Sequence, residues 1–319
     1  MSEKALVAKL RALFSDKIGD DAAIVGDDVV TCDMLVEDVD FTRSIPLSFI
    51  ARKALAVNLS DLAAMGAAPR YAVLALGLPE WVMPHLDAFL NALADAAKEH
   101  EIEIVGGDLS RAAKLTISVT AVGAIVTRPL LRSGAKPGDR VYLSRPIGGS
   151  ATGLHLLLNG WTLDGDPPRP AGFAHRELAI SAMRRHVDPE PEVALGLKLA
   201  KIAEVTSCID VSDGLSTDLH HLCDASNVGA ELERERIPVF PDLVNDAPQL
   251  GVRAQDVVLH GGEEYALLFT ASLPESQLSA RLGRPVYAIG RIVTRDRGII
   301  LRENGVPRAL EAKGYDHFG

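Results

Sequence analysis

Five short acidic segments are the parts of this sequence best suited to chemistry. Each places Asp beside Gly, Ser, Thr or Asn, or at the end of an apolar run, where turns and helix starts hold carboxylates at the edge of an element. The segments are Ile18-Gly19-Asp20-Asp21, Thr31-Cys32-Asp33, Asn58-Leu59-Ser60-Asp61, Gly106-Gly107-Asp108 and Ile209-Asp210-Val211-Ser212-Asp213. Carboxylates that converge without basic partners repel one another, and hard divalent cations with oxygen ligands relieve that repulsion. The set therefore favours a Mg²⁺ site that serves a nucleotide polyphosphate.

Each segment taken alone also has a purely structural interpretation. Asp20 and Asp21 suit a turn, Asp108 and Asp213 suit the N-caps of helices, and Asp61 suits an exposed helix position. The joint occurrence of all five segments is what favours a site.

The elements that must position these carboxylates alternate between helix and strand. Residues 44–65 are typical of a helix that Gly66 ends, and residues 81–100 predict a second helix. Short apolar runs predict strands at 71–78, 102–105 and 115–126. We expect the strand at 102–105 to end where Gly106 and Gly107 begin. This half of the chain is therefore predicted to be an α/β or α+β domain with a mixed sheet.

A polar segment at residues 132–139, with two Gly and one Pro, separates two apolar strands. We place the domain boundary there, with one domain at 1–137 and the other at 138–319. After a strand at 140–143, the turn Gly148-Gly149-Ser150 opens a helix, and this combination predicts an anion cradle. Arg132 lies in the linker near that cradle, where its guanidinium could hold phosphate oxygens or could be an ordinary surface group.

The rest of the second half is predicted to be α/β as well. Helices are expected near 175–186 and 192–203, and a strand at 207–211 leads into Asp213. A late hairpin is expected around Asn304-Gly305.

Composition limits the class of protein. The chain has 319 residues, more than one hydrophobic core usually serves, so two domains are expected. Acidic residues number 43 against 33 Lys plus Arg, and no basic block indicates nucleic-acid binding. The three cysteines lack CxxC spacing, which favours a reduced cytoplasm. We expect no secretion signal and no membrane segment, because the apolar runs are far shorter than the roughly 20 residues a membrane helix needs.

Several common catalytic motifs are absent from the sequence. It has no GxxxxGK[ST] phosphate loop, no GxGxxG dinucleotide turn and no HExxH zinc helix. The segment around Ser150 approaches the GxSxG nucleophile elbow, but Thr152 stands where that motif requires Gly. A nucleotide-using enzyme of this sequence must therefore handle phosphates with metal ions and loop glycines.

Taken together, the motifs of this chain closely resemble those of the thiamine-monophosphate kinase family. They span almost the whole sequence: Ile18-Gly19-Asp20-Asp21-Ala22-Ala23, Asn58-Leu59-Ser60-Asp61-Leu62-Ala63-Ala64-Met65-Gly66, Gly106-Gly107-Asp108, Arg132-Ser133-Gly134-Ala135-Lys136-Pro137-Gly138-Asp139, Asp210-Val211-Ser212-Asp213-Gly214, Gly261-Gly262-Glu263-Glu264-Tyr265 and Gly314-Tyr315-Asp316-His317-Phe318. The run beginning at Asn58 is shared, in looser form, by the wider aminoimidazole ribonucleotide synthetase-like superfamily. The Gly-Tyr-Asp-His-Phe ending is more specific to the kinases.

The resemblance implies a two-domain α/β homodimer that uses ATP to phosphorylate thiamine monophosphate to thiamine diphosphate, by direct in-line transfer. It implies several Mg²⁺ ions and leaves room for a monovalent cation. By similarity, the metal ligands would be Asp21, Asp33, Asp61, Asp108, Asp210 and Asp213, with Cys32 beside them. The ATP contacts would be Asp21, Gly107, Asp108, Arg132 and Ser212. The substrate contacts would be Asp40, Glu263 and Tyr315.

Two positions depart from the family pattern. Asp40 stands where the family commonly has His, and Cys32 stands where Ser or Thr usually precedes Asp33. These departures keep two rival interpretations open, a sister activity in which ATP phosphorylates another oxygen and a binding module without turnover. The sister activities that rely on a reactive early Cys or on a C-terminal Cys are disfavoured, because this chain ends in Phe318 and Gly319.

Overall fold

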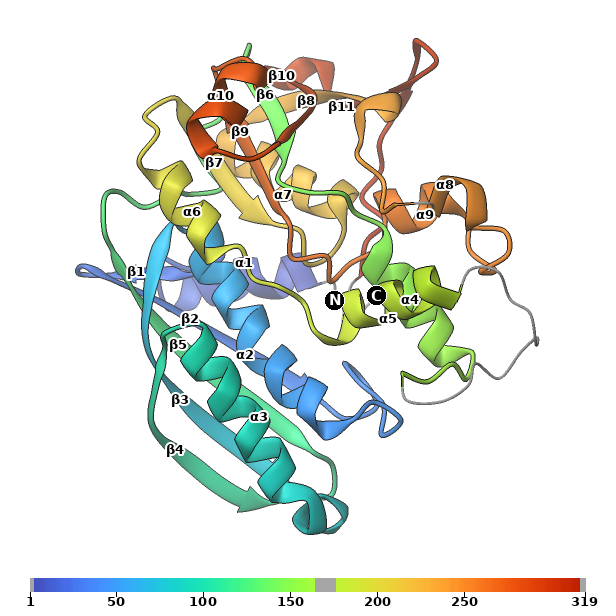
Figure 1. The fold of residues 1–319 in the computed structure, drawn as a ribbon. Coiled ribbons are helices and arrows are strands. Elements are labelled where there is room, and N and C mark those ends of the chain that lie inside the picture. Colours follow the sequence, from blue (N-terminus) through green and yellow to red (C-terminus); the bar gives the residue numbers. More distant parts are fainter. Residues whose placement is uncertain (1–2, 164–175, 242, 316–319) are drawn as a thin grey trace.

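The computed structural model describes residues 3–163, 176–241 and 243–315. Within them the chain forms two domains, each built on one sheet with helices packed on it (Figure 1). The elements of the first domain are α1 Glu3–Leu13, β1 Ala23–Val25, β2 Asp28–Val36, α2 Leu47–Ala64, β3 Ala67–Leu78, a 3-10 helix Glu80–His85, α3 Leu86–Glu99, β4 Glu103–Arg111 and β5 Thr116–Ile125.

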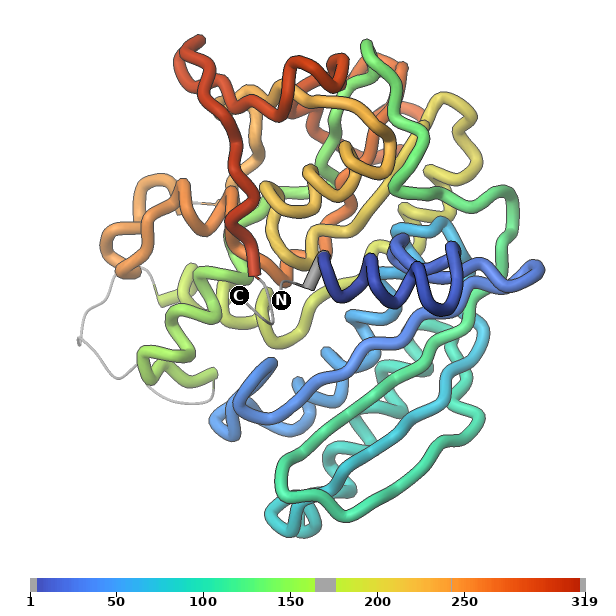
Figure 2. The backbone as a smooth tube through the Cα atoms, turned by 180° about the vertical axis from the view of Figure 1, so that it is seen from behind, coloured from blue at the N-terminus to red at the C-terminus, as the bar shows by residue number. Residues whose placement is uncertain are grey.

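The first sheet has five strands in the order β1-β2-β5-β3-β4. All neighbours are antiparallel except β3 and β4, which are parallel because α3 carries the chain back between them. Helices α2 and α3 lie on one face of this sheet. Seen from behind, the strands lie in front of these two helices (Figure 2). The sheet thus has one face that packs on helices and one that does not pack on α2 or α3.

Helix α2 is buried on nearly all sides, which its apolar sequence explains. Most of its residues are buried, and Leu55, Leu59 and Leu62 are fully so. A helix that is apolar all round must have partners on every side. Here α2 lies between the first sheet and the second domain, where it contacts α6. A Cβ on Gly196 of α6 would lie 2.0 Å from the Ala63 carbonyl oxygen, so only Gly permits this approach.

The second domain is a seven-stranded sheet flanked by helices. Its elements are β6 Arg140–Leu143, α4 Gly149–Leu158, α5 Arg176–Val187, α6 Val193–Ala200, β7 Val205–Asp210, α7 Leu215–Ser226, β8 Val228–Glu233, a 3-10 helix Arg234–Arg236, α8 Leu243–Asp246, α9 Ala254–Leu259, β9 Leu267–Ala271, α10 Glu275–Leu282, β10 Tyr287–Thr294, a 3-10 helix Arg295–Arg297, β11 Ile299–Glu303 and β12 Val306–Ala309. The strand order is β12-β11-β8-β10-β6-β9-β7, and only β8 and β11 pair in parallel. The domain boundary proposed between 137 and 138 falls in the segment that joins the two sheets.

One strand is longer than the sequence predicts. Strand β4 does not end at Gly106 and Gly107 but continues through them to Arg111, paired with β3 except at a register shift that skips Val105. Gly107 allows the pairing, because a Cβ there would lie 1.8 Å from the Leu74 carbonyl oxygen. The expectation that Asp108 caps a helix is therefore wrong, since Asp108 lies inside an edge strand.

Other local predictions are confirmed. Helix α2 ends next to Gly66, which has a φ of 64°, and Asn304 and Gly305 turn the β11–β12 hairpin with φ values of 49° and 80°. Among the described residues, none of the helices has the length and apolar character needed to cross a bilayer.

Candidate active site

Three of the predicted carboxylates meet where the two domains face each other. One oxygen from each of Asp21, Asp61 and Asp210 lies within 4.8 Å of the other two. Asp21 precedes β1, Asp61 lies on α2, and Asp210 ends β7. Segments up to 189 residues apart in the sequence therefore build one site across the domain interface. We call Asp21, Asp61, Asp210 and the neighbouring Asp33 the acidic cluster.

Short side chains fix the carboxylates that lie along α2 and β2. The Thr31 hydroxyl donates to Asp61 Oδ2 at 2.5 Å, and the backbone N–H of Asp33 donates to Asn58 Oδ1 at 2.9 Å. Thr31 and Asp33 share one face of β2 because side chains alternate along a strand. Asn58 and Asp61 share one face of α2 because they are three residues apart. The sequence run around Asn58 thus places Asp61 opposite Asp33.

The second domain and the linker contribute the remaining contacts. The buried Ser60 hydroxyl donates to Asp210 Oδ2 at 2.5 Å across the domain interface. Arg132 donates to Asp21 Oδ1 from both Nε, at 3.1 Å, and a terminal guanidinium nitrogen, at 2.6 Å. The Arg132 backbone N–H binds the Asp20 carboxylate. Arg132 is the linker residue expected to hold phosphate oxygens, and in this structure its guanidinium pairs with the acidic cluster.

The acidic cluster carries more negative charge than its surroundings balance. Burial, opposed by Arg132 and reinforced by Asp210 and Asp20, raises the pKa of Asp21 to about 7. Burial raises the pKa of Asp33 and of Asp210 to about 6 in each case. Burial and then the charges of Asp33 and Asp210 raise the pKa of Asp61 well above its ordinary value. Like charges held together in a buried place resist ionisation unless a cation joins them.

The donor set fits a hard divalent cation. Asp21 Oδ2 is buried and has no hydrogen-bond partner among the described residues. Carboxylate oxygens are the ligands that Mg²⁺ prefers, and Mg²⁺ in phosphate-transfer sites keeps water and phosphate as further ligands. Asp21, Asp61 and Asp210, with Asp33 beside them, are thus the residues suited to such an ion.

Asp213 belongs to a second group of carboxylates that adjoins the first. Ligand atoms of Asp213, Asp218 and His221 lie within 4.8 Å of one another. Burial and then the charges of Asp213 and Asp210 raise the pKa of Asp218 well above its ordinary value. Asp218 also accepts hydrogen bonds from the backbone of Asp213 and Gly214, which holds the turn before α7. The predicted ligands Asp210 and Asp213 are therefore on one loop but in two adjoining groups.

Glu263, a predicted substrate contact, is held by two buried side chains. Lys53 Nζ of α2 lies 2.6 Å from Glu263 Oε1, and His186 Nδ1 of α5 lies 3.3 Å from Glu263 Oε2. Lys53 and His186 are 3% and 1% exposed, whereas the Glu263 side chain is 27% exposed. Burial alone would raise the pKa of Glu263, but the charge of Lys53 lowers it below its ordinary value. We call Lys53, Glu263 and His186 the Glu263 anchor.

Tyr265 links the Glu263 anchor to the acidic cluster. Its hydroxyl hydrogen-bonds Glu263 and contributes to lowering the pKa of that carboxyl. Burial, followed by the charges of Glu263 and of the acidic cluster, raises the pKa of Tyr265 well above its ordinary value. The backbone N–H of Glu263 donates to the Ser212 carbonyl at 2.7 Å, so Glu263 also lies against the loop that carries Asp210 and Asp213.

The other two predicted substrate contacts lie on loops. The Tyr315 backbone N–H donates to the Asp213 carbonyl at 3.1 Å, and its side chain is exposed. Residues 316–318, which complete the terminal motif, lie outside the described residues. Asp40 accepts a hydrogen bond from the Val36 backbone at 2.7 Å, and its charge acts on Asp33. Asp40 thus closes its own turn beside the acidic cluster.

Three predicted residues lie away from the acidic cluster in this chain. The exposed Cys32 thiol contacts Ser118 and Thr120 on the sheet face opposite to Asp33, because adjacent strand residues point to opposite faces. Asp33 pairs with Val119, Val119 with Leu74, and Leu74 with Gly107. Three strand spacings separate Asp33 from Gly107, which is roughly 14 Å. Asp108 aligns with Met34 across the two intervening strands, β3 and β5. Asp108 therefore lies on the same face of the sheet as Cys32.

The predicted anion cradle is already filled by a protein carboxylate. The backbone N–H groups of Gly148 and Ser150, at the start of α4, donate to Glu264 Oε1 at 2.8 and 2.9 Å. A helix N-terminus attracts any anion, and Glu264 is the buried anion that reaches it. The expectation that this turn holds phosphate is therefore wrong in this structure.

Sequence reasoning missed Lys53 and His186. Lys53 is a charged residue in the apolar stretch of α2, and a helix apolar on all sides leaves a Lys nowhere to reach water. That mismatch was the available signal. His186 gave none, because its burial depends on how α4 and α5 pack.

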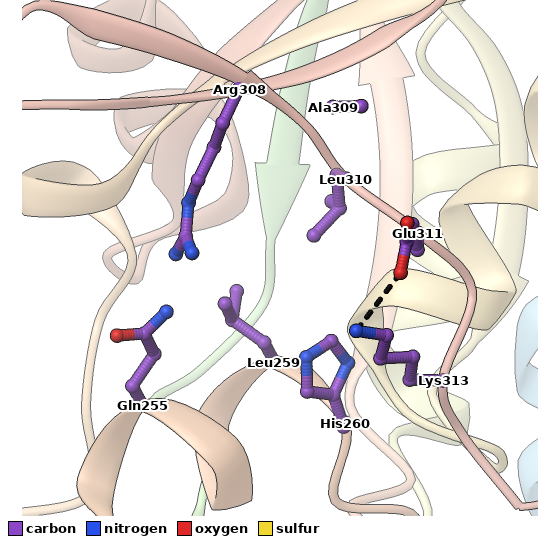
Figure 3. A pocket seen from close by; sticks show the side chains of 8 residues that line it. All are labelled: Gln255, Leu259, His260, Arg308, Ala309, Leu310, Glu311 and Lys313. Carbon is purple, nitrogen blue, oxygen red and sulfur yellow. Dashed lines mark ion pairs between the residues drawn. The ribbon is translucent and has the colours of Figure 1, made fainter.

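A shallow pocket of about 60 Å³ lies near the C-terminal end of the described chain (Figure 3). Arg308 and Lys313 line it together with His260 and Gln255. Its cations are already paired, Lys313 with Glu311 at 2.9 Å and Arg308 with Glu303 at 3.6 Å. The pocket is therefore close to neutral and lacks the carboxylates of the acidic cluster.

Two family models match the chain in tandem. The model of the AIR synthase related protein, N-terminal domain, matches residues 19–125, and that of the AIR synthase related protein, C-terminal domain, matches residues 136–302. The acidic cluster draws residues from both matched regions.

Relatives match over nearly the full length. A thiamine-monophosphate kinase of Bacillus subtilis is 36% identical over 316 residues, covering 94% of this chain and 93% of the relative. One of Escherichia coli is 36% identical over 315 residues, covering 94% and 91%. A solved structure of AaThiL complexed with AMPPCP and TMP matches with a TM-score of 0.86 and 30% identity, covering 99% of this chain and 97% of that one. A structure of a HypE-HypF complex, 20% identical with a TM-score of 0.77, shares the fold.

Proposed function

The chain belongs to the AIR synthase related family, in its thiamine-monophosphate kinase branch, and we propose that it performs the branch reaction at the acidic cluster. The reaction is ATP-dependent phosphorylation of thiamine monophosphate to thiamine diphosphate. One observation supports the proposal above all. Asp21, Asp61 and Asp210 converge at the domain interface, and the guanidinium of Arg132 lies next to them. Phosphoryl transfer needs charge neutralisation and alignment more than it needs a nucleophilic side chain.

Mg²⁺ would be held by Asp21, Asp33, Asp61 and Asp210, with Asp213 on the adjoining turn. When bound, Mg²⁺ neutralises polyphosphate oxygens and orients them for transfer. The chain itself supplies rigidity, because Thr31, Asn58 and Ser60 hold the loops and helix that carry the carboxylates. Arg132 is placed to exchange its contact with Asp21 for a phosphate oxygen once cations occupy the cluster. Ser212, between Asp210 and Asp213, would lie beside the same phosphates.

We propose direct in-line transfer without a general base. The attacking group is a phosphate oxygen of thiamine monophosphate, and a phosphate monoester is already largely ionised near neutral pH. None of the described side chains therefore needs to remove a proton. The required work is to bring two polyanions together, which explains why the site is built from cation ligands.

The substrate end would lie at Glu263. The thiazolium ring of thiamine is a cation, and a partly exposed carboxylate beside the cluster is a suitable partner for it. Tyr315 is exposed next to the Asp213 carbonyl and could pack against an aromatic ring. Asp40 lies close enough to Asp33 for its charge to raise the pKa of that carboxyl, which supports a position for Asp40 near the acidic cluster.

We further propose a homodimer formed through the sheet face that does not pack on α2 or α3. On this face the apolar side chains of Met34 and Val73 are 58% and 41% exposed. Apolar side chains exposed together on one sheet face are typical of a surface that a partner covers. Asp108 lies on this same face, so Gly107 and Asp108 would serve the site of the second copy. We also propose a cytoplasmic location, in keeping with the three free cysteines.

The kinase proposal is tested by product analysis. Purified protein is incubated with MgATP and thiamine monophosphate, and ADP and thiamine diphosphate are resolved by chromatography. We expect equal amounts of ADP and thiamine diphosphate from the monophosphate, none from free thiamine, and none from an Asp61→Asn variant. Binding of both substrates without product would contradict the kinase and support a binding module. Failure to bind the monophosphate would support a sister ATP-dependent activity.

The dimer proposal is tested by mixing two inactive variants. Asp61→Asn and Asp108→Asn chains carrying different affinity tags are coexpressed, and the mixed dimers are purified by both tags. If Asp108 serves the partner, each mixed dimer holds one complete site, and turnover per dimer returns to about half that of the unmodified protein. If Asp108 serves its own chain, both sites stay incomplete and the mixed dimers are inactive.

A further inference from the structure

The Glu263 carboxylate is fixed from three sides by residues of both domains. Its backbone is bound to the Ser212 carbonyl at 2.7 Å and has a φ of 60°, a left-handed conformation that costs a non-glycine residue free energy. Lys53, from the first domain, holds Oε1 at 2.6 Å, and His186, from the second domain, faces Oε2 at 3.3 Å. The two carboxylate oxygens are thus occupied on the inner side.

Glu263 is the least enclosed member of the Glu263 anchor. The Glu263 side chain is 27% exposed, while Lys53 and His186 are almost entirely enclosed. A salt bridge that serves stability alone does not require one partner to be more exposed than the other. Apolar residues of similar volume usually stabilise a buried position as well as an ion pair does. The arrangement instead presents a carboxylate with a defined orientation.

His186 contributes a neutral donor to this arrangement. Burial, and then the charge of Lys53, lowers the pKa of His186 to about 4, so its ring is uncharged near pH 7. The neutral tautomer that donates from Nδ1 to Glu263 leaves Nε2 as an acceptor, and Nε2 is buried without a partner among the described residues. Ser150 Oγ lies 3.2 Å from the same Nδ1. Lys53 is therefore the one full positive charge in the Glu263 anchor, and the ionised carboxylate is the negative end of a fixed ion pair.

We propose that Lys53 and His186 are positioning residues that orient the Glu263 carboxylate to select a cationic ring in the phosphate-ester substrate. The inference rests on the kinase proposal and adds to it the source of ring specificity. Neither residue touches the substrate, because both are enclosed behind Glu263. Their effect is to make Glu263 a preset anion, so that the binding of a cationic ring costs little reorganisation.

The test compares two ligands that differ in ring charge. Thiamine monophosphate carries a thiazolium, and an analogue with a thiophene in its place has the same shape without the charge. Dissociation constants for both, and for a non-hydrolysable ATP analogue, are measured by calorimetry with Mg²⁺ present. The variants are Lys53→Met, which keeps the length and removes the charge, Lys53→Arg, which restores a cation, and His186→Asn, which keeps a donor near Nδ1.

Arg52 offers a matched control on the same helix. It also forms a salt bridge across the domain interface, 2.7 Å from Asp188, but does not contact Glu263. We expect the unmodified protein to prefer the cationic ligand, and Lys53→Met to weaken thiamine monophosphate binding about tenfold with little change for the thiophene analogue or the ATP analogue. Lys53→Arg should recover part of the preference, His186→Asn should reduce it less, and Arg52→Met should leave it unchanged.

Several outcomes would overturn the inference. They are equal affinity of the unmodified protein for the two rings, an equal loss for both rings in Lys53→Met, or a loss for the ATP analogue as large as that for thiamine monophosphate. If Lys53→Met does not fold, His186→Asn carries the comparison, with Lys53→Arg as the variant that keeps the charge. Product analysis of the unmodified protein separates the two proposals: absence of thiamine diphosphate refutes the kinase, whereas turnover with an unchanged ring preference in the variants refutes only the positioning role.

Discussion

The acidic cluster and the Glu263 anchor are two buried charged regions of one site that solve the problem of burying charge in opposite ways. The acidic cluster gathers four carboxylates around a single close guanidinium, and burial raises the pKa of Asp21 to about 7. The Glu263 anchor pairs one carboxylate with one ammonium group at 2.6 Å, and the charge of Lys53 lowers the pKa of Glu263 despite burial. The protein alone leaves the negative charge of the acidic cluster unbalanced, whereas it balances the charge of Glu263.

This difference indicates whether each region needs an added ion to balance its charge. Buried like charges destabilise a protein unless cations neutralise them, so on the proposed function the acidic cluster lowers stability until cations bind. A paired carboxylate needs no added ion and instead gains a fixed direction. The contrast predicts that removing a charge has opposite effects on stability in the two regions.

The largest effect is expected for Asp61→Asn in the acidic cluster. Turnover should fall on the order of 10³-fold, because cation binding and phosphate alignment depend on this oxygen. The free energy of unfolding of the metal-free protein should rise, on the order of 1 kcal/mol, because a buried like charge is removed. Product chromatography and thermal unfolding without divalent ions measure the two effects. A metal-free variant less stable than the unmodified protein would show that the charge of Asp61 does not destabilise the acidic cluster.

The opposite sign is expected for Lys53→Met in the Glu263 anchor. Removing one partner of a buried pair leaves Glu263 uncompensated and should lower the free energy of unfolding by about 2–4 kcal/mol. A double variant, Lys53→Met with Glu263→Gln, should recover most of that loss because no charge is left unpaired. Urea denaturation gives the values. Equal losses for the single and double variants would mean that packing, not the charge pair, is what the substitution disturbs.

The pH dependence of stability should sharpen the contrast through His186. Its pKa is about 4 when folded, and an unfolded His has a value near 6.5. The unfolded chain therefore binds more protons below about pH 6.5, and the stability contributed by neutral His186 is lost as pH falls from there towards 4. Between pH 7 and pH 5 the unmodified protein should lose about 2 kcal/mol more than His186→Asn does. If the free energies of unfolding of the unmodified protein and of His186→Asn change equally with pH across this range, His186 is not held neutral.

The smallest effect is expected for Cys32→Ser. The Cys32 thiol faces Ser118 and Thr120 on the sheet face opposite to Asp33, so it belongs to neither charged region. A hydroxyl of similar size keeps those contacts, and turnover and its Mg²⁺ dependence should change less than about twofold. A marked change in the Mg²⁺ concentration that gives half-maximal turnover would place the thiol at the metal after all.

The sequence allowed the acidic cluster to be predicted because its logic is chemical and local. Asp beside Gly, Ser or Asn at the ends of apolar runs marks the edges of elements, and α2 is marked by its apolar run and by Gly66. The family resemblance then joined segments that lie far apart in the chain. The two sheets and their helices follow the same periodic signals.

Other features depend on packing that no local pattern encodes. Gly106 and Gly107 suggest a turn, yet the close approach of Gly107 to Leu74 keeps β4 in the sheet. The glycine turn at Gly148 predicts a phosphate cradle, yet Glu264, 116 residues away, occupies it. Side chains alternate along β2, so Cys32 and Asp33 point to opposite faces of the sheet, and the sequence alone could have predicted this.

On the proposed function, the acidic cluster binds divalent cations and the Glu263 anchor does not. Mn²⁺ is a paramagnetic substitute for Mg²⁺, and its binding can be followed by electron paramagnetic resonance in the unmodified protein, Asp61→Asn and Glu263→Gln, each without nucleotide. We expect Asp61→Asn to lower the affinity for Mn²⁺ by at least about tenfold and Glu263→Gln to bind Mn²⁺ as the unmodified protein does. Equal Mn²⁺ affinity in Asp61→Asn and the unmodified protein would contradict the proposed cation site.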